Sequence, residues 1–175
     1  FADFVQDPVR NPLSTSSGKI EIYSTAISEN PNPYGLGVIP PIPTWIPQYD
    51  PDPRYPLEVC SPKSRARTHS IHGNQARLAR FDPDDILIHE DDAASRGIEN
   101  GALVRIFNEQ GATILPANVT DKIARGVVAI KEGAWFQSNA NGIDVGGCGN
   151  VLSLDRPAPS GATTYNTNQV QVEPA

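Results

Sequence analysis

Short runs in which apolar and polar residues alternate recur along the chain and predict β-strands. They lie at residues 19–24, 55–59, 86–88, 103–107, 112–119, 126–130 and 169–172, with a further apolar run at 150–154. Gly, Asn, Pro or Ser, which are typical of turns, lie beside most of these runs. Residues 89–97 predict a short helix, because His89 can cap it, acidic residues fill its first turn and Gly97 can end it. This pattern predicts a mainly β domain, most simply a barrel.

Residues 29–56 break this pattern, because they hold nine of the 17 prolines. Such a composition excludes a helix or a central strand. Tyr34, Trp45, Tyr49 and Tyr55 are spaced among the prolines, which favours an extended arm held against a surface over the alternative of a flexible linker. We therefore expect an N-terminal strand and Pro-rich arm packed on the barrel over residues 1–56, and the barrel itself over residues 57–175.

Composition narrows the function classes. The chain has 14 Lys and Arg against 20 Asp and Glu, and no apolar run is long enough to predict a membrane span. General binding of nucleic acid would need a basic surface, so nucleic acid is not an expected partner. Cys60 and Cys148 lack CxxC spacing, and we expect each to be a small buried residue. The absence of methionine predicts a processed product or a piece of a longer protein.

The polar loop at residues 60–74 is the strongest candidate for a binding site. Between Ser61 and Arg80 the chain has five cations and no carboxylate, although the rest of it is strongly acidic. Arginine, serine, threonine and histidine side chains suit a phosphate-bearing ligand held at one place. Two alternatives stay open: a solvated polar loop without a ligand, and a metal bound by His69 and His72, for which no third ligand is evident.

Other chemistry has less support. Asp84 with Asp85, and Asp91 with Asp92, are explained by loop entry and by a helix first turn, so general acid–base catalysis is not indicated. No GxSxG motif supports a hydrolase triad. The Gly-rich run at residues 146–150 lets backbone approach a ligand closely, and Asn150 offers a donor and an acceptor to a planar heterocycle. Together with the polar loop, this run predicts two edges of one groove.

Eight segments, in order along nearly the whole chain, resemble one family. They are NPL and SGKIEIYS near the N-terminus, PPIPTW, SPKSRARTHS, DAASRGI, EGAW, NVLSLDRP and TYNT. They resemble the C-terminal molybdopterin dinucleotide-binding domain of dimethyl sulfoxide reductase type oxidoreductases. Two positions depart from the family pattern: Ser16 stands where proline is usual, and Cys148 where a polar residue is common.

The resemblance implies a six-stranded double-psi β-barrel, of the aspartate decarboxylase-like kind, with one or more short helices. It implies that this barrel covers one side of a bis(molybdopterin guanine dinucleotide) cofactor, which carries molybdenum in the complete enzyme. The resemblance implies no catalytic residue and no metal ligand in this chain. It also implies that the chain alone does not bind the cofactor tightly. The implied cofactor contacts are Ser61, Ser64, Arg65, Arg67, Thr68, His69, Ser70, Trp135, Asn150 and Asn166.

As a function, the resemblance implies the cofactor-binding part of an anaerobic respiratory molybdenum oxidoreductase, inactive by itself. Implied partners are upstream domains of the same subunit, an iron–sulfur electron-transfer subunit and a membrane anchor subunit. The implied location is the bacterial periplasm or the outer face of the cytoplasmic membrane, reached by twin-arginine export. Alternatives are a stand-alone double-psi barrel that serves as an adaptor or anion-binding module, and an extracellular adhesion module.

Overall fold

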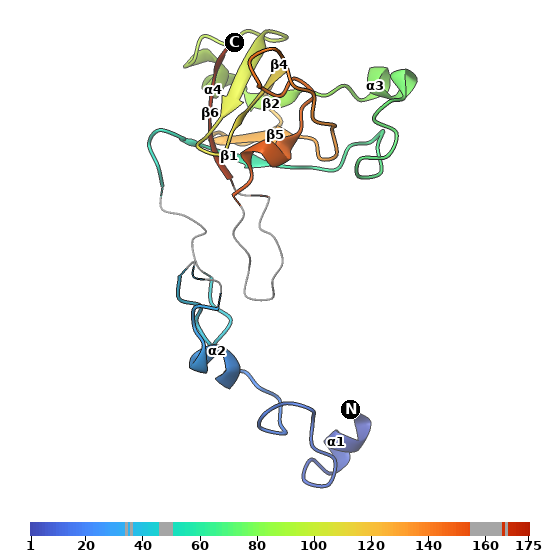
Figure 1. Cartoon of the computed structure of the whole chain (residues 1–175), viewed down its shortest axis with the longest axis vertical. Coiled ribbons are helices and arrows are strands. Elements are labelled where there is room, and N and C mark those ends of the chain that lie inside the picture. The colour runs from blue at the N-terminus through green and yellow to red at the C-terminus, as the bar shows by residue number, and fades with distance from the viewer. Residues whose placement is uncertain (34, 36, 46–50, 155–165, 167) are drawn as a thin grey trace. The chain divides into compact units, whose positions relative to one another are not determined.

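The computed structural model describes residues 1–33, 35, 37–45, 51–154, 166 and 168–175 (Figure 1). The chain divides into two compact units, residues 1–47 with 159–161, and residues 48–158 with 162–175. The first unit contains two short helices, α1 (Ala2–Gln6) and α2 (Thr25–Glu29). Within the described ranges, the helices are all too short or too polar to cross a membrane.

The predicted N-terminal strand at residues 19–24 is wrong. Ser24 instead caps α2, because its hydroxyl accepts a hydrogen bond from Ile27 N at 3.3 Å. Its own amide donates to Pro41 O at 2.8 Å. Ile20 and Ile22, the apolar half of the alternation, are 61% and 75% exposed. Alternation predicts a strand only where a neighbouring strand completes the hydrogen-bond ladder, and this segment has none.

The second unit is a closed barrel, which confirms the predicted six strands with short helices. Its strands are β1 (Leu57–Cys60), β2 (Ile86–His89), β3 (Leu103–Phe107), β4 (Ala112–Thr120), β5 (Val127–Ile130) and β6 (Asn168–Pro174). They close in the order β1-β5-β2-β4-β3-β6. The pairs β1–β5 and β2–β4 are parallel and the other four are antiparallel. Closure removes the unpaired edges that an open sheet would expose.

Strand alternation builds the barrel core. Alternate residues of β2, β3 and β5 point inward, and Ile86, Ile106 and Val128 among them are fully buried. Leu152 closes one end of this core from η1 (Gly149–Leu152), a 3-10 helix that forms where the sequence showed only an apolar run. The core therefore holds the strand ends, and the loops that leave them, in fixed positions.

Two further helices differ in how well the sequence predicted them. The predicted helix at residues 89–97 is confirmed as α4 (Glu90–Ala94), which His89 caps by accepting from Asp91 N at 3.1 Å. Gly97 follows it with φ +66°. The other helix, α3 (Ala76–Phe81), was not predicted; it buries none of its residues and projects from the barrel at the end of the polar loop (Figure 1).

Only the end of the Pro-rich segment can be placed on the barrel. Tyr55 packs edge-on against Phe107, with ring centroids 6.2 Å apart, and Asp52 N donates to Gln169 Oε1 at 3.2 Å. Tyr34 and Tyr49 lie outside the described residues. The division into an arm over residues 1–56 and a barrel over residues 57–175 stays a prediction.

Strand direction determines which loops meet. Because β1 and β5 are parallel, their carboxyl ends lie at the same edge of the barrel. Strands β2 and β6 are antiparallel to β5 and β1, so the residues that lead into them reach that edge too. One edge therefore gathers the polar loop after β1, residues 82–85, residues 131–134 and Asn166.

Candidate functional site: a polar cavity at one edge of the barrel

A cavity of about 600 Å³ lies at this edge. Its walls come from the polar loop, from the segment after β5 and from the turn that leads into η1. The residues that line it are Ser61, Lys63, His69, Ser70, Glu132, Gly133, Ala134, Cys148, Gly149, Asn150, Ser153 and Leu154. The two predicted groove edges, the polar loop and the Gly-rich run, thus line the same cavity.

Hydrogen bonds and a close backbone contact hold the polar loop against Asn166 and against the segment after β5. Ser61 N donates to the side-chain oxygen of Asn166 at 2.8 Å, and Glu132 N donates to Pro62 O at 3.0 Å. Gly133 has φ +84°, and a Cβ at that position would lie 1.8 Å from His69 O. Only glycine lets the two segments approach so closely.

The polar loop itself turns sharply at its histidines. His69 and His72 have φ values of +51° and +75°, in a region that side chains other than glycine rarely adopt. The indole of Trp135 donates to Ser70 O at 2.7 Å, which fixes the turn between the two histidines. The imidazole rings of His69 and His72 are both exposed. In the described part of the chain, no group of three His, Cys, Asp or Glu could hold a metal ion.

The ten predicted contact residues divide into three groups. Ser61, His69, Ser70 and Asn150 line the cavity. Asn166 and Trp135 support it through their hydrogen bonds to Ser61 and Ser70. The other four, Ser64, Arg65, Arg67 and Thr68, lie in the same loop but do not line the cavity.

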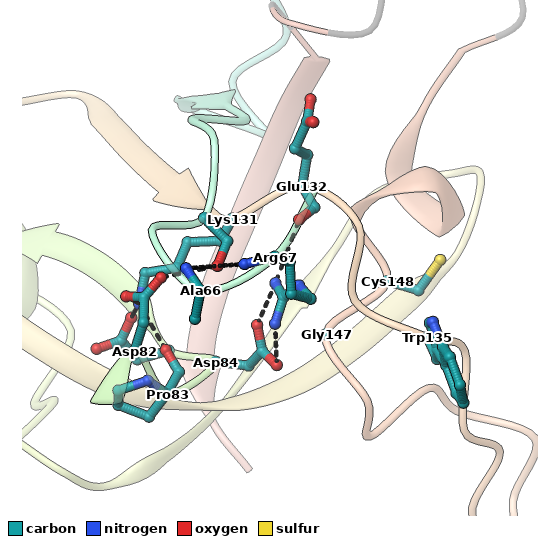
Figure 2. A network of polar contacts seen from close by, with 12 residues as sticks. Ala66, Arg67, Asp82, Pro83, Asp84, Lys131, Glu132, Trp135, Gly147 and Cys148 are labelled. Atoms are coloured by element: carbon teal, nitrogen blue, oxygen red, sulfur yellow. Dashed lines mark hydrogen bonds and ion pairs between the residues drawn. The ribbon is translucent and has the colours of Figure 1, made fainter. Parts of the chain in front are cut away.

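Arg67 points toward Asp84 and the backbone of Glu132 (Figure 2). Its side chain is 5% exposed and donates to both carboxylate oxygens of Asp84, at 2.9 and 2.7 Å. It also donates to the backbone oxygen of Glu132 at 3.2 Å. Arg67 therefore connects the polar loop to the segment after β5.

Ser64 and Arg65 are also used within the loop. The buried Ser64 hydroxyl donates to Asp82 Oδ2 at 2.8 Å and accepts from the amides of Ala66 and Arg67. The Arg65 guanidinium lies over the Phe81 ring, 5.0 Å from its centroid. These contacts order the loop and anchor α3 to it.

A buried ion cluster below the loop was missed by the sequence analysis. Lys131 Nζ lies 3.0 Å from Asp82 Oδ1 and 2.9 Å from Asp85 Oδ1, and donates to Pro83 O. Burial alone would lower the pKa of Lys131, but the two carboxylates outweigh it and raise that pKa. For Asp82, burial would raise the pKa, but hydrogen bonds from Ser64, Lys131 and Arg65 N outweigh burial and lower that pKa. The position of Asp82 and Asp85 just before a buried strand was the available signal.

Asp144 is a further residue that the sequence analysis missed. It is fully buried and accepts five hydrogen bonds, from the Thr113 hydroxyl and from the amides of Gln137, Gly146, Gly147 and Cys148, at 2.7 to 3.0 Å. Burial would raise its pKa, but these donors hold it below the ordinary value. Asp144 thereby shapes the Gly-rich turn that forms one cavity wall. An acid flanked by Gly142 and the glycine pair was the available signal.

The prediction that both cysteines are buried is wrong. Cys60 and Cys148 are both partly exposed free thiols. Cys148 lines the cavity because its amide is held by Asp144 at the end of the turn. Burial raises the pKa of the Cys60 thiol, which keeps it in its neutral form.

One carboxylate faces the cavity and meets two basic side chains. Lys63 Nζ donates to Glu132 Oε1 at 2.6 Å, and His69 Nδ1 lies 3.2 Å from the same oxygen. The hydrogen bond from Lys63 holds the pKa of Glu132 below its ordinary value, so this side chain is ionised at neutral pH. The loop thus carries less free positive charge than its sequence suggests, because Lys63 and Arg67 both have acidic partners.

The site fits a phosphate-bearing nucleotide. A volume of about 600 Å³ lies within the usual range for small-molecule sites. Lysine, imidazole and hydroxyl groups on one wall can donate to phosphate oxygens, whereas Asn150 and the Gly149 backbone on the other wall can meet the edge of a heterocycle. A Cβ at Gly149 would meet Ser61 Oγ at 3.7 Å, so the two walls approach each other closely there.

Comparison with known proteins agrees with this geometry. The family model described as "Molydopterin dinucleotide binding domain" matches residues 57–170, which include the whole cavity. The chain therefore belongs to the molydopterin dinucleotide binding domain family, as the resemblance of its motifs predicted.

Curated relatives are reductases. Dimethyl sulfoxide reductase DmsA of Escherichia coli is 42% identical over 99% of this chain, and that of Haemophilus influenzae is 38% identical over the same share. A dimethyl sulfoxide/trimethylamine N-oxide reductase of Cereibacter sphaeroides is 38% identical over 89% of it. The chain spans 20% to 23% of these three relatives.

A solved structure supports the fold. Acetylene hydratase from Pelobacter acetylenicus matches with a TM-score of 0.74 over 97% of this chain and 25% of that chain, at 20% sequence identity. At this identity the match shows a shared fold.

Proposed function

We propose that this chain is the part of a molybdenum-dependent oxidoreductase of the dimethyl sulfoxide reductase type that binds and covers bis(molybdopterin guanine dinucleotide). The observation that carries the proposal is the cavity at the edge of the barrel, in which phosphate donors and a heterocycle-binding amide face each other. The family match over the same residues and the names of the relatives support it. The cofactor, when bound, supplies the redox chemistry.

The chain's own residues bind and orient. Lys63, His69 and Ser70 are placed to hold phosphate oxygens, and Asn150 to hold the edge of a flat heterocycle. Of the other predicted contacts, Asn166 and Trp135 fix the backbone of the cavity wall. In this proposal Ser64 and Arg67 act through the loop that they order, because the Ser64 hydroxyl bonds to Asp82 and both terminal nitrogens of Arg67 bond to Asp84.

The proposal assigns no catalytic residue to this chain, which would be inactive by itself. The substrate of the complete enzyme would be a small oxide of the kind that the relatives' names give, such as dimethyl sulfoxide or trimethylamine N-oxide. Its partners would be the remaining domains of the same subunit, an iron–sulfur electron-transfer subunit and a membrane anchor. Its location would be the bacterial periplasm or the outer face of the cytoplasmic membrane.

Guanosine diphosphate tests the proposal, because it carries the diphosphate and guanosine of the dinucleotide. We expect isothermal titration calorimetry, at concentrations suited to weak ligands, to detect weak binding to the 175-residue chain, since tight binding by the chain alone is not expected. Asn150→Ala should weaken this binding about tenfold, the effect of one lost hydrogen-bonding side chain. Asn141→Ala, an exposed asparagine outside the cavity, is the matched control. Absence of binding, or equal affinity of both variants, would contradict the proposal.

A further inference from the structure

The Glu132 carboxylate occupies a position suited to a ligand oxygen. Its Oε1 atom lies 2.6 Å from Lys63 Nζ and 3.2 Å from His69 Nδ1, and all three side chains line the cavity. Two basic side chains from the polar loop therefore converge on one acidic oxygen. A phosphate oxygen is likewise an anionic hydrogen-bond acceptor, so it can take that place.

The backbone of Glu132 is held by hydrogen bonds that do not involve its carboxylate. Its amide donates to Pro62 O at 3.0 Å, and its carbonyl accepts from Arg67 at 3.2 Å. The next residue, Gly133, lies directly against His69 O. Figure 2 shows the carboxylate directed away from the Arg67–Asp84 pair, so that pair does not restrain it.

We propose that Glu132 sets the affinity of the cavity for the nucleotide, because its carboxylate competes with the diphosphate for Lys63 and His69 and yields this position when the nucleotide enters. This inference rests on the proposed function of the cavity, and it adds Lys63 and Glu132 to the residues that determine how tightly the ligand binds. A ligand gains the two donors only if it carries enough negative charge to replace the carboxylate.

Because the side chains of Lys63 and His69 are exposed, a ligand can replace Glu132 as their partner. The side chains of Lys63 and His69 are 68% and 74% exposed and that of Glu132 is 20% exposed, so water reaches the two basic groups and weakens their attraction to Glu132. A diphosphate offers more charged oxygens than the two of Glu132, and therefore competes well. An uncharged nucleoside gains nothing from displacing Glu132. The diphosphate thus reaches Lys63 and His69 at the cost of displacing Glu132, whereas a nucleoside neither gains these groups nor meets this cost.

The test compares guanosine diphosphate with guanosine. Calorimetry on the 175-residue chain should show that Glu132→Gln binds guanosine diphosphate about three- to tenfold more tightly than the unaltered chain, with guanosine unaffected. Glu109→Gln is the matched control, because Glu109 forms an equally short ion pair, 2.6 Å from Arg54, and lies outside this cavity. Both variants change the net charge equally, and urea unfolding verifies that both stay folded.

A second pair of variants each removes one lysine, Lys63 in the cavity or Lys122 outside it. Lys63→Ala should weaken binding of guanosine diphosphate, whereas Lys122→Ala, an exposed lysine outside the cavity, should not. If the unaltered chain binds guanosine diphosphate and Glu132→Gln does not improve it, or improves it no more than Glu109→Gln, the role of Glu132 is refuted and the proposed function stands. If the unaltered chain and every variant fail to bind it, both proposals are refuted.

Discussion

Both terminal nitrogens of Arg67 bond to the two carboxylate oxygens of Asp84, at 2.9 and 2.7 Å. The pair joins the polar loop, which follows β1, to the segment that leads into β2, and Arg67 also reaches the Glu132 carbonyl. It explains how a long polar loop with little apolar surface is kept in one conformation. Its effect on ligand binding is therefore indirect.

Arg67→Ala should lower the free energy of unfolding by about 3 kcal/mol, the lower end of the range for breaking a buried ion pair. The physical reason is that Asp84, which is only 29% exposed, loses its partner. Urea unfolding at neutral pH measures the change. Arg77→Ala is the control, because Arg77 is exposed on α3, and it should cost less than about 0.5 kcal/mol. Equal values for the two variants would contradict a structural role of Arg67.

Asp144→Asn should destabilise the protein by about 3 kcal/mol at neutral pH, because a carboxamide cannot accept all five hydrogen bonds of the carboxylate. Its NH2 group would also face amide donors. Urea unfolding of both proteins at pH 7 gives the difference. Asp121→Asn, in an exposed turn, is the control and should be nearly neutral.

The difference in stability between the unaltered chain and Asp144→Asn should depend on pH. Because folding holds the pKa of Asp144 below its unfolded value of about 4, its contribution to stability is present above that value and is lost as pH falls through the lower, folded pKa. The stability difference between the unaltered chain and Asp144→Asn should therefore shrink below about pH 4. A difference that grows on acidification would contradict this assignment.

Gly133→Ala should be more harmful than Gly101→Ala, although both glycines have similar positive φ values of +84° and +82°. A methyl group at Gly101 meets open space and should cost about 1 kcal/mol, from backbone strain alone. At Gly133 the methyl group would collide with His69 O and push the segment after β5 away from the polar loop. The urea midpoints of the two variants measure the difference, and equal midpoints would show that the close approach to His69 is not required.

Strand alternation predicted the barrel well but did not predict which loops would meet. The runs that became β1, β2 and β5 are apolar enough to mark buried strands, yet their pairing is non-local and depends on the whole closed sheet. Residues 19–24 show the converse case, because their alternation has no neighbouring strand to pair with.

Candidate site residues were found where their chemistry alone marked them. Ser61, His69 and Asn150 lie in polar or Gly-rich runs and do line the cavity. Arg67 has the same chemistry, but its partner Asp84 lies 17 residues away and becomes its neighbour only when the barrel closes. Asp144 and Glu132 were overlooked for a similar reason, since their donors come from segments far apart in the sequence or from backbone amides.

A crystal structure of the chain with guanosine diphosphate would show whether the cavity binds the nucleotide part of the cofactor. We expect the diphosphate within hydrogen-bonding distance of Lys63 and His69, the guanosine beside Asn150, and the Glu132 carboxylate turned away from Lys63. A nucleotide bound elsewhere, for example on the exposed arginines Arg77 and Arg80 of α3, with the cavity free of ligand, would contradict this expectation.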